Sequence, residues 1–265
     1  MMNILEAMIA TGIQPVSATS RYGWFEAPGH TVGRPEVFVS ALFNQWWNVK
    51  DPEHHGDAYK LASYLQGVSI DEAAKMLGPV DPMMEMPKRD IKRSLIEIED
   101  VKPIETDTAQ KAVMKSEVPF DKTLQYCKDF KYTNNGVKGL RVFGLWNMSG
   151  GIISLDFSGR HKDPIARDVA LIPGDGSKAG TCILVVGIKE FLLLDEVSED
   201  VALLPSSNIL NRAIPFLAHY DIIECVCQAY YLKPELRKNI PSAQIRVSHN
   251  EPQGLWDGTL FADVE

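Results

Sequence analysis

The last third of the chain alternates short apolar runs with helical patterns, and this alternation limits the possible folds most strongly. The run CILVVG at 182–187 is apolar throughout, as expected for a strand that is buried on both faces. Helical KEFLLLDEV, the run VALLP, helical ILNRAIPFLAHY, strand-like IIECVC, a further helix and QIRVS follow in order. Strands that alternate with helices predict a small parallel sheet with helices on both of its faces.

The first 78 residues predict a compact β-rich module with flanking helices. Apolar residues recur at helical spacing from Asn3 to Ile13, and Gly12 ends this pattern. The segment 20–49 is rich in Gly, Pro and aromatic residues, and its short alternating runs predict small strands joined by turns. Two helices are expected in 57–78. Ser69, with Glu72 three residues later, predicts a capping box at the start of the second.

The segment 79–117 holds Pro82, Pro87 and Pro103 among mixed charges, which predicts a linker in which only IEIED has strand character. Beyond it we expect a helix over 124–130 and strands in GLRVFGLW, GGIISLDF and ARDVALI. The expected fold class is therefore mixed, α+β with an α/β part. Its parts are a module at 1–78, a linker at 79–117 and a core at 118–265, with the parallel sheet at about 166–250.

Charge and cysteine content limit the classes of function. The chain has 27 Lys and Arg against 35 Asp and Glu, a formal charge of -8, so any nucleic-acid contact must be local. Four cysteines form neither a disulfide framework nor a zinc site by spacing, which favours a reducing cytoplasm. The first apolar run has no basic segment before it, and no run approaches the length of a membrane span, so neither export nor membrane insertion is expected.

The N-terminal module runs through APGH at 27–30, RPEVF at 34–38, the segment 46–55, GD at 56–57 and IDEAA at 70–74. In this order it resembles the zinc-ribbon module of the bacterial replicative primase family, in the compact form carried by phages and mobile elements. The corresponding family parts are a Cys-Pro-Phe-His turn, a Pro-Ser-Phe strand, a Cys-x-x-Cys knuckle, Gly-Gly-Asp and a Glu-Ala helix pattern. Of the four zinc ligands that the resemblance implies, only His30 is present, and one imidazole cannot hold a structural zinc. We expect a zinc-ribbon-like module without zinc.

YCKDFKY, GLWNMSGG and RDVALI precede ILVVGIKEF and IIECVCQA, an order that resembles the RNA-polymerase core of the same family with its terminal Toprim domain. In that family one strand ends in Glu-Gly with an acidic residue after it, and a later strand ends in Asp-x-Asp; these carboxylates hold Mg²⁺. Here Val186 replaces the Glu, Glu190 keeps the later acidic position, and Cys225 and Cys227 replace the two Asp. The resemblance thus implies a Toprim fold that lacks three of four metal-binding carboxylates.

These losses predict a primase-derived pseudoenzyme that acts by binding, as an accessory or DNA-binding protein in the replication of a phage or mobile element. One alternative is an active primase or Toprim nuclease whose metal site is rebuilt from Glu190, Glu224, Asp221 and Asp156. Another is a protein-interaction role without nucleic acid. No cofactor is expected, and weak Mg²⁺ binding at Glu190 and Glu224 is the alternative. Cys225 and Cys227 share a strand face, which suits either a soft-metal or redox pair or two small buried residues.

Candidate contacts for single-stranded DNA combine rings that stack on bases with cations that follow the backbone. They are Arg21, Trp24, Arg34, Trp46, Trp47, Lys88, Arg89, Arg160 and Lys162. The alternative for the tryptophans is a metal-free core. The basic run 87–93 is either a phosphate or partner contact or a solvated tether. The loop residues His54 and His55 are expected to be solvated. The expected partners are single-stranded DNA or replication proteins, and the oligomeric state is not predicted.

Overall fold

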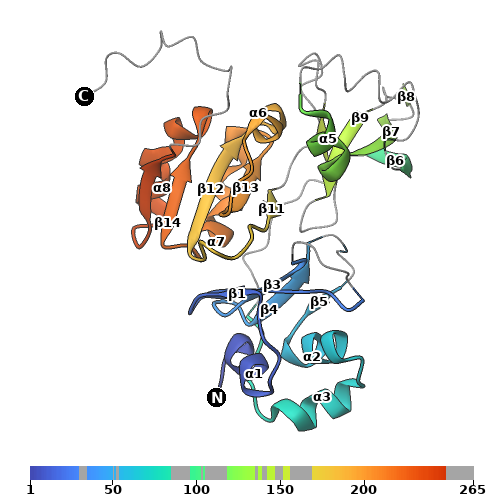
Figure 1. The fold of residues 1–265 in the computed structure, drawn as a ribbon, viewed down its shortest axis with the longest axis vertical. Coiled ribbons are helices and arrows are strands. Elements are labelled where there is room, and N and C mark those ends of the chain that lie inside the picture. The colour runs from blue at the N-terminus through green and yellow to red at the C-terminus, as the bar shows by residue number, and fades with distance from the viewer. Residues whose placement is uncertain are drawn as a thin grey trace.

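The computed structural model describes residues 1–29, 35–49, 51, 54–84, 96–102, 104, 118–134, 137–138, 142–146, 152–155 and 169–248, with backbone alone for the strands between 96 and 155. The described strands form three five-stranded sheets, one near each end of the described chain and one in its middle (Figure 1). Within the described residues no helix is both long and apolar enough to cross a bilayer.

The N-terminal sheet is antiparallel, and its five strands lie in chain order. They are β1 Ser17–Ala18, β2 Tyr22–Phe25, β3 Val37–Ser40, β4 Gln45–Asn48 and β5 His55–Gly56, with helices α1 Ile4–Ala10, α2 Ala58–Gln66 and α3 Ile70–Leu77. The expected helices and small strands are confirmed. The capping box is confirmed as well, because the Ser69 side chain accepts from the Glu72 N–H while the Glu72 carboxylate accepts from the Ser69 N–H.

The three central strands of the N-terminal sheet are apolar on both faces, and the two faces pack against different partners. Phe25, Val39 and Trp46 point toward a core that includes α1, α2 and α3. Tyr22, Trp24 and Phe38 point the other way and join a core with residues of the C-terminal sheet. Side chains alternate along a strand, so one strand serves both cores. The small module therefore gains a second buried face.

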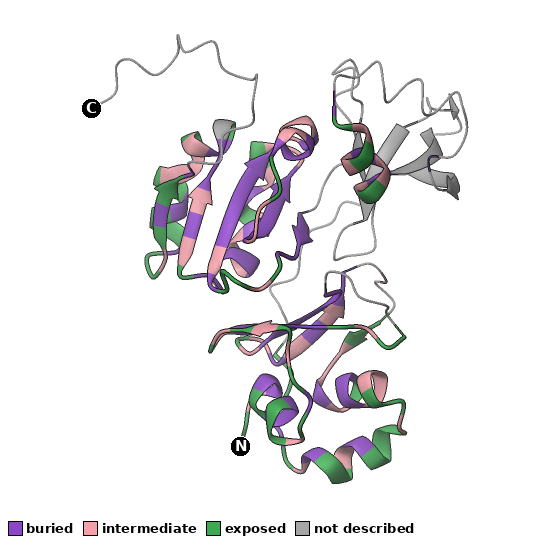
Figure 2. Cartoon of the chain, in the orientation of Figure 1, coloured by how far each residue is buried: buried purple, intermediate pink, exposed green. Residues whose placement is uncertain are grey.

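The C-terminal sheet has the order β11-β13-β12-β14-β15, with the last four strands parallel and β11 antiparallel at the edge. Its elements are β11 Ala170–Ile172, β12 Thr181–Val186, α6 Ile188–Leu193, β13 Asp200–Leu204, η1 Ser207–Ile209, α7 Leu210–Leu217, β14 Ile222–Cys225, η2 Cys227–Leu232, α8 Lys233–Asn239 and β15 Gln244–Val247. The predicted alternation is confirmed. Helices α7 and α8 cover one face, α6 covers the other, and β12 in the centre is buried along nearly its whole length (Figure 2).

The middle sheet corrects two sequence predictions. It contains β6 Ile96–Lys102, β7 Lys128–Asn134, β8 Val137–Lys138, β9 Val142–Trp146 and β10 Ile152–Leu155, all antiparallel. Because β6 pairs with β7, the part of the interval 79–117 in which strand character was expected belongs to the middle sheet and not to a linker. The helix expected over 124–130 is α5 Phe120–Tyr126 instead. It ends there because Cys127 takes an extended conformation and Lys128 begins β7.

Helix α5 packs against α6 of the C-terminal sheet. Lys122 donates from Nζ to the carbonyl oxygens of Phe191 (2.9 Å) and Leu194 (2.5 Å), which lie at the C-terminal end of α6. A cation at this end of a helix satisfies carbonyls that lack intrahelical partners. The rings of Tyr126 and Phe191 meet edge to face at 5.0 Å.

Candidate functional site

The strand order changes direction between β12 and β14, so the C-terminal ends of these two strands form the switch point of the sheet. The chain leaves β12 through α6 toward β13 on one side, and it leaves β14 through η2 and α8 toward β15 on the other. In open parallel sheets ligands bind where the connections diverge in this way. The register pairs Leu184 with Cys225, so Val186 lies just beyond the level at which β14 ends. Val186 and Cys225 therefore lie at the ends of adjacent strands, and both belong to one hydrophobic cluster.

The residues at this switch point are buried in apolar surroundings. Val186 is 6% exposed and Cys225 is fully buried. Burial raises the pKa of the Cys225 thiol to about 12, so the thiol is protonated near neutral pH. Metal binding requires a thiolate, which makes Cys225 a poor ligand here. Its contacts are those of a small core residue, because it lies in the same cluster as Cys182 and Leu184. Cys227 begins η2, and its side chain lies outside the described atoms.

Glu190 is the carboxylate in the first turn of α6, which follows the C-terminal end of β12. Its side chain folds back over Gly187, where a Cβ atom would collide with the carboxylate, and Gly187 has a φ of +97° that other residues rarely adopt. Burial raises the pKa of the Glu190 carboxyl above its usual range, against smaller opposing effects of its own N–H and of Lys189. Half-buried Glu190 therefore binds its proton more readily than a solvated glutamate.

Two other carboxylates of the rebuilt metal site, Asp221 and Glu224, do not join Glu190. Asp221 precedes β14 at the opposite end of the sheet and forms an ion pair with Arg21 at 3.2 Å. Glu224 lies within β14 and accepts a hydrogen bond from Ser248 Oγ at 3.2 Å. Asp156 is outside the described residues. Among the residues that the structure describes, no three His, Cys, Asp or Glu side chains form a cluster suited to a metal ion.

Two predicted DNA-stacking rings are buried, which corrects the proposed aromatic platform. Trp24 is fully buried and Trp46 is 2% exposed, so no base can stack on either ring. Half-buried Trp47 packs against Phe38 and Phe216, with ring centroids 6.0 and 6.2 Å apart. The alternative, rings that pack in the core of the protein, describes these three side chains. Of the cations, Arg21 is engaged with Asp221. His30, Arg34, Lys88, Arg89, Arg160 and Lys162 lie outside the described residues.

The N-terminal and C-terminal sheets are joined by a buried polar junction centred on Asp200. Trp24 Nε1 and Tyr220 Oη donate to Asp200 Oδ2 at 2.8 and 2.9 Å, and the Gly174 N–H donates to Oδ1 at 2.8 Å. Burial raises the pKa of the Asp200 carboxyl above its usual range, and hydrogen bonds from these donors and from Tyr22 limit the rise. A buried carboxylate with several donors is costly to disturb.

A second part of the same junction pairs Ser40 of β3 with His219 after α7. His219 Nδ1 lies 2.8 Å from the Phe216 carbonyl oxygen, which can only accept, so Nδ1 carries the proton. Nε2 then accepts from Ser40 Oγ at 2.7 Å. Burial lowers the pKa of His219 to about 4, so the ring is neutral near pH 7. Sequence analysis missed this junction. Its signal was the two-faced apolar pattern of YGWF, VFVS and QWWN, which predicts a sheet covered on both sides.

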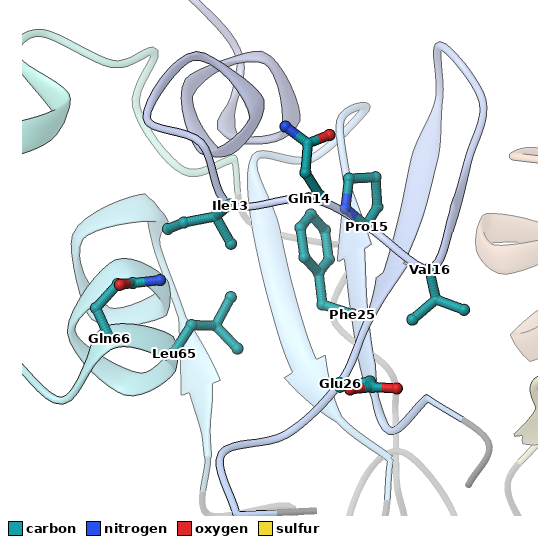
Figure 3. A pocket seen from close by; sticks show the side chains of 8 residues that line it. All are labelled: Ile13, Gln14, Pro15, Val16, Phe25, Glu26, Leu65 and Gln66. Atoms are coloured by element: carbon teal, nitrogen blue, oxygen red, sulfur yellow. The ribbon is translucent and has the colours of Figure 1, made fainter. Parts of the chain in front are cut away.

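Two of the surface cavities that described residues line lie in the N-terminal module. One, of about 330 Å³, lies between the segment after α1, the end of β2 and the end of α2, with Ile13, Phe25 and Leu65 around it (Figure 3). Its polar lining consists of Gln14, Gln66 and Glu26 and holds no cation. The other, of about 310 Å³, is lined by Trp46, His54, His55, Lys60, Ser63, Tyr64 and Ile70.

Comparison with known proteins gives one structural likeness. No family model matches the chain, and no curated protein matches its sequence. Among solved structures it is similar to the crystal structure of the zinc-binding and RNA polymerase domains of the Aquifex aeolicus primase. The two chains are 13% identical, with a TM-score of 0.34, over 95% of this chain and 81% of that chain.

Proposed function

We propose that this protein is derived from a primase and acts by binding, not by phosphoryl transfer, as an accessory factor in DNA replication of a phage or mobile element. The observation that carries the proposal is the composition of the switch point between β12 and β14. Val186 and protonated Cys225 stand where the primase resemblance expects carboxylates. Phosphoryl transfer depends on metal ions that neutralise charge on the phosphates, and Glu190 alone is a poor substitute for several carboxylates.

The binding partner that we propose first is single-stranded DNA, contacted through the basic run 87–93 rather than through the buried tryptophans. This run places four cations around one Asp in an otherwise acidic chain. Cations that replace condensed counterions give an affinity that falls steeply with salt. The proposal requires no aromatic stacking.

Fluorescence anisotropy of labelled single-stranded DNA over a range of salt tests this role. We expect binding that weakens with salt. In a double variant, Lys88→Gln with Arg89→Gln, the slope of log K against log salt should fall by about 0.7 for each phosphate that the variant no longer neutralises. Arg237→Gln with Lys238→Gln is the matched control, since these cations are exposed on α8. An equal reduction in both double variants would contradict a local DNA site.

A protein-interaction role is the second candidate, and the burial of Trp24 and Trp46 favours it. Because these buried rings cannot stack on bases, less attraction is left to offset the repulsion between DNA and a chain with a net charge of -8. Absence of DNA binding at low salt would select this role over the first.

A further inference from the structure

The second cavity of the N-terminal module has the features of a small-molecule site. We propose that it binds a small anionic ligand through an oxyanion group, with Lys60 as its charge partner and the Trp46 indole N–H as a donor. The cavity is formed by β4, β5, α2 and the first residue of α3, and its volume of about 310 Å³ lies at the lower end of the range for small-molecule sites.

Trp46 supplies the first observation. The side chain is 2% exposed, and its Nε1 has no hydrogen-bond acceptor within the described part of the chain. A buried donor without a partner costs about 1–3 kcal/mol, so such donors are rare unless a ligand or water serves them. The indole stacks on Tyr64 with centroids 5.0 Å apart and 26° between the planes. The ring is thus held in place while its N–H still lacks an acceptor.

Lys60 supplies the second observation. Its stem lies directly on the backbone of β5, because a Cβ atom at Gly56 would be only 2.6 Å from Lys60 Cδ. Gly56 has a φ of +150°, so a side chain there would be strained as well as obstructed. Among the described residues no carboxylate forms an ion pair with the Lys60 ammonium. The fold therefore positions this cation at the cavity without neutralising it.

The remaining polar lining also favours an anion. His54 Nδ1 pairs with Asp51 Oδ2 at 2.9 Å, and its ring packs on Tyr64 at 4.8 Å, so this imidazole is held in place. Its Nε2, an acceptor in the neutral ring, does not count among the donors. His55 adds a second imidazole. No carboxylate is among the described residues that line this cavity, whereas the first cavity has Glu26 and no cation. The lining offers donors and positive charge, which is the chemistry that binds phosphate or carboxylate oxygens.

Isothermal titration of the full chain with inorganic phosphate and, separately, with acetate tests the site, at constant ionic strength set with chloride. We expect one saturable site for at least one of these anions, and the preferred anion distinguishes a phosphate from a carboxylate group. Lys60→Met keeps the stem over Gly56 and removes the charge, so we expect at least tenfold weaker binding. Lys75→Met is the control, because Lys75 is exposed on α3 away from the lining and should bind as wild type.

Trp46→Phe tests the donor while it keeps an aromatic ring on Tyr64, and a severalfold decrease in affinity is expected. Circular dichroism with thermal unfolding separates a binding defect from a folding defect in this variant. No saturable binding of either anion, or binding that Lys60→Met leaves unchanged, would overturn the proposal.

Discussion

Burial shifts the pKa values of two side chains at the junction of the two outer sheets. Asp200 is a buried carboxylate whose donors come from the N-terminal sheet, from the chain before β14 and from the segment after β11. His219 is a buried imidazole that stays neutral because burial lowers its pKa to about 4. Both groups titrate differently in the folded and unfolded chain, so both make stability depend on pH.

Trp24→Phe should destabilise the protein more than Trp46→Phe. Both substitutions shrink a buried indole to a phenyl ring, but only Trp24 donates to a carboxylate. A hydrogen bond to a charged group is worth about 1.5–3 kcal/mol, so we expect the decrease in unfolding free energy to be about 2 kcal/mol greater for Trp24→Phe. Urea unfolding followed by circular dichroism measures both variants. Equal decreases would mean that Asp200 gains nothing from the indole.

Acid should weaken the fold through His219. The folded pKa of His219 is about 4 and the unfolded pKa is 6.5, so its stabilising effect is complete above pH 6.5 and is lost as pH falls toward 4. At 1.36 kcal/mol per pKa unit the decrease amounts to about 3 kcal/mol. Asp200 acts in the opposite sense, because its raised pKa favours the folded state as the carboxyl becomes protonated.

The comparison with His219→Gln isolates the histidine, since Asp200 is common to both proteins. Unfolding free energies measured in urea at several pH values should fall less steeply below pH 6.5 in His219→Gln than in wild type. Parallel curves would show that His219 does not titrate in this way.

At the scale of helices and strands, local signals predicted elements well where they were strong. The apolar run CILVVG became β12, and Ser69 with Glu72 became the start of α3 as expected. Prediction was incomplete where pairing partners decide. Strand character was expected in IEIED at 96–100, but neither proline content nor charge in that interval reveals that β6 pairs with β7. The prediction that Trp24 stacks on DNA failed for a related reason. Trp24 is buried against the C-terminal sheet, and its partner Asp200 lies 176 residues away in the sequence.

Removal of the cap of α3 should cost a modest amount of stability. Ser69→Ala deletes the acceptor of the Glu72 N–H, and such substitutions cost about 1 kcal/mol. Ser69→Asp, which keeps an acceptor oxygen, is expected to retain most of the stability. Thermal unfolding of both variants provides the measurement, and an Asp variant as weak as the Ala variant would argue against capping.

At the scale of the whole molecule, the two sheets that share a core come from opposite ends of the described chain. The N-terminal and C-terminal sheets share one buried core, which includes Tyr22 and Phe38 from one and Phe216 and Tyr220 from the other. The middle sheet lies between them in sequence. The division into 1–78, 79–117 and 118–265 therefore describes chain order, whereas the hydrophobic contacts unite the two outer parts.

A substitution in one outer part should consequently weaken the other. Tyr220→Phe removes a donor to Asp200, and we expect it to lower the protection of β3 amides and β14 amides by the same amount, about 1–3 kcal/mol. Native-state hydrogen exchange resolves the two strands. Reduced protection in β14 with unchanged β3 would show that the two sheets open independently.

The central claim is that the switch point between β12 and β14 does not hold a catalytic metal. Calorimetric titration of the full chain with Mn²⁺, with Glu190→Gln in parallel, tests this claim most directly. We predict no stoichiometric site in the micromolar range and identical traces for the two proteins. A one-to-one site that Glu190→Gln abolishes would contradict the account and would favour an active enzyme with a rebuilt metal centre.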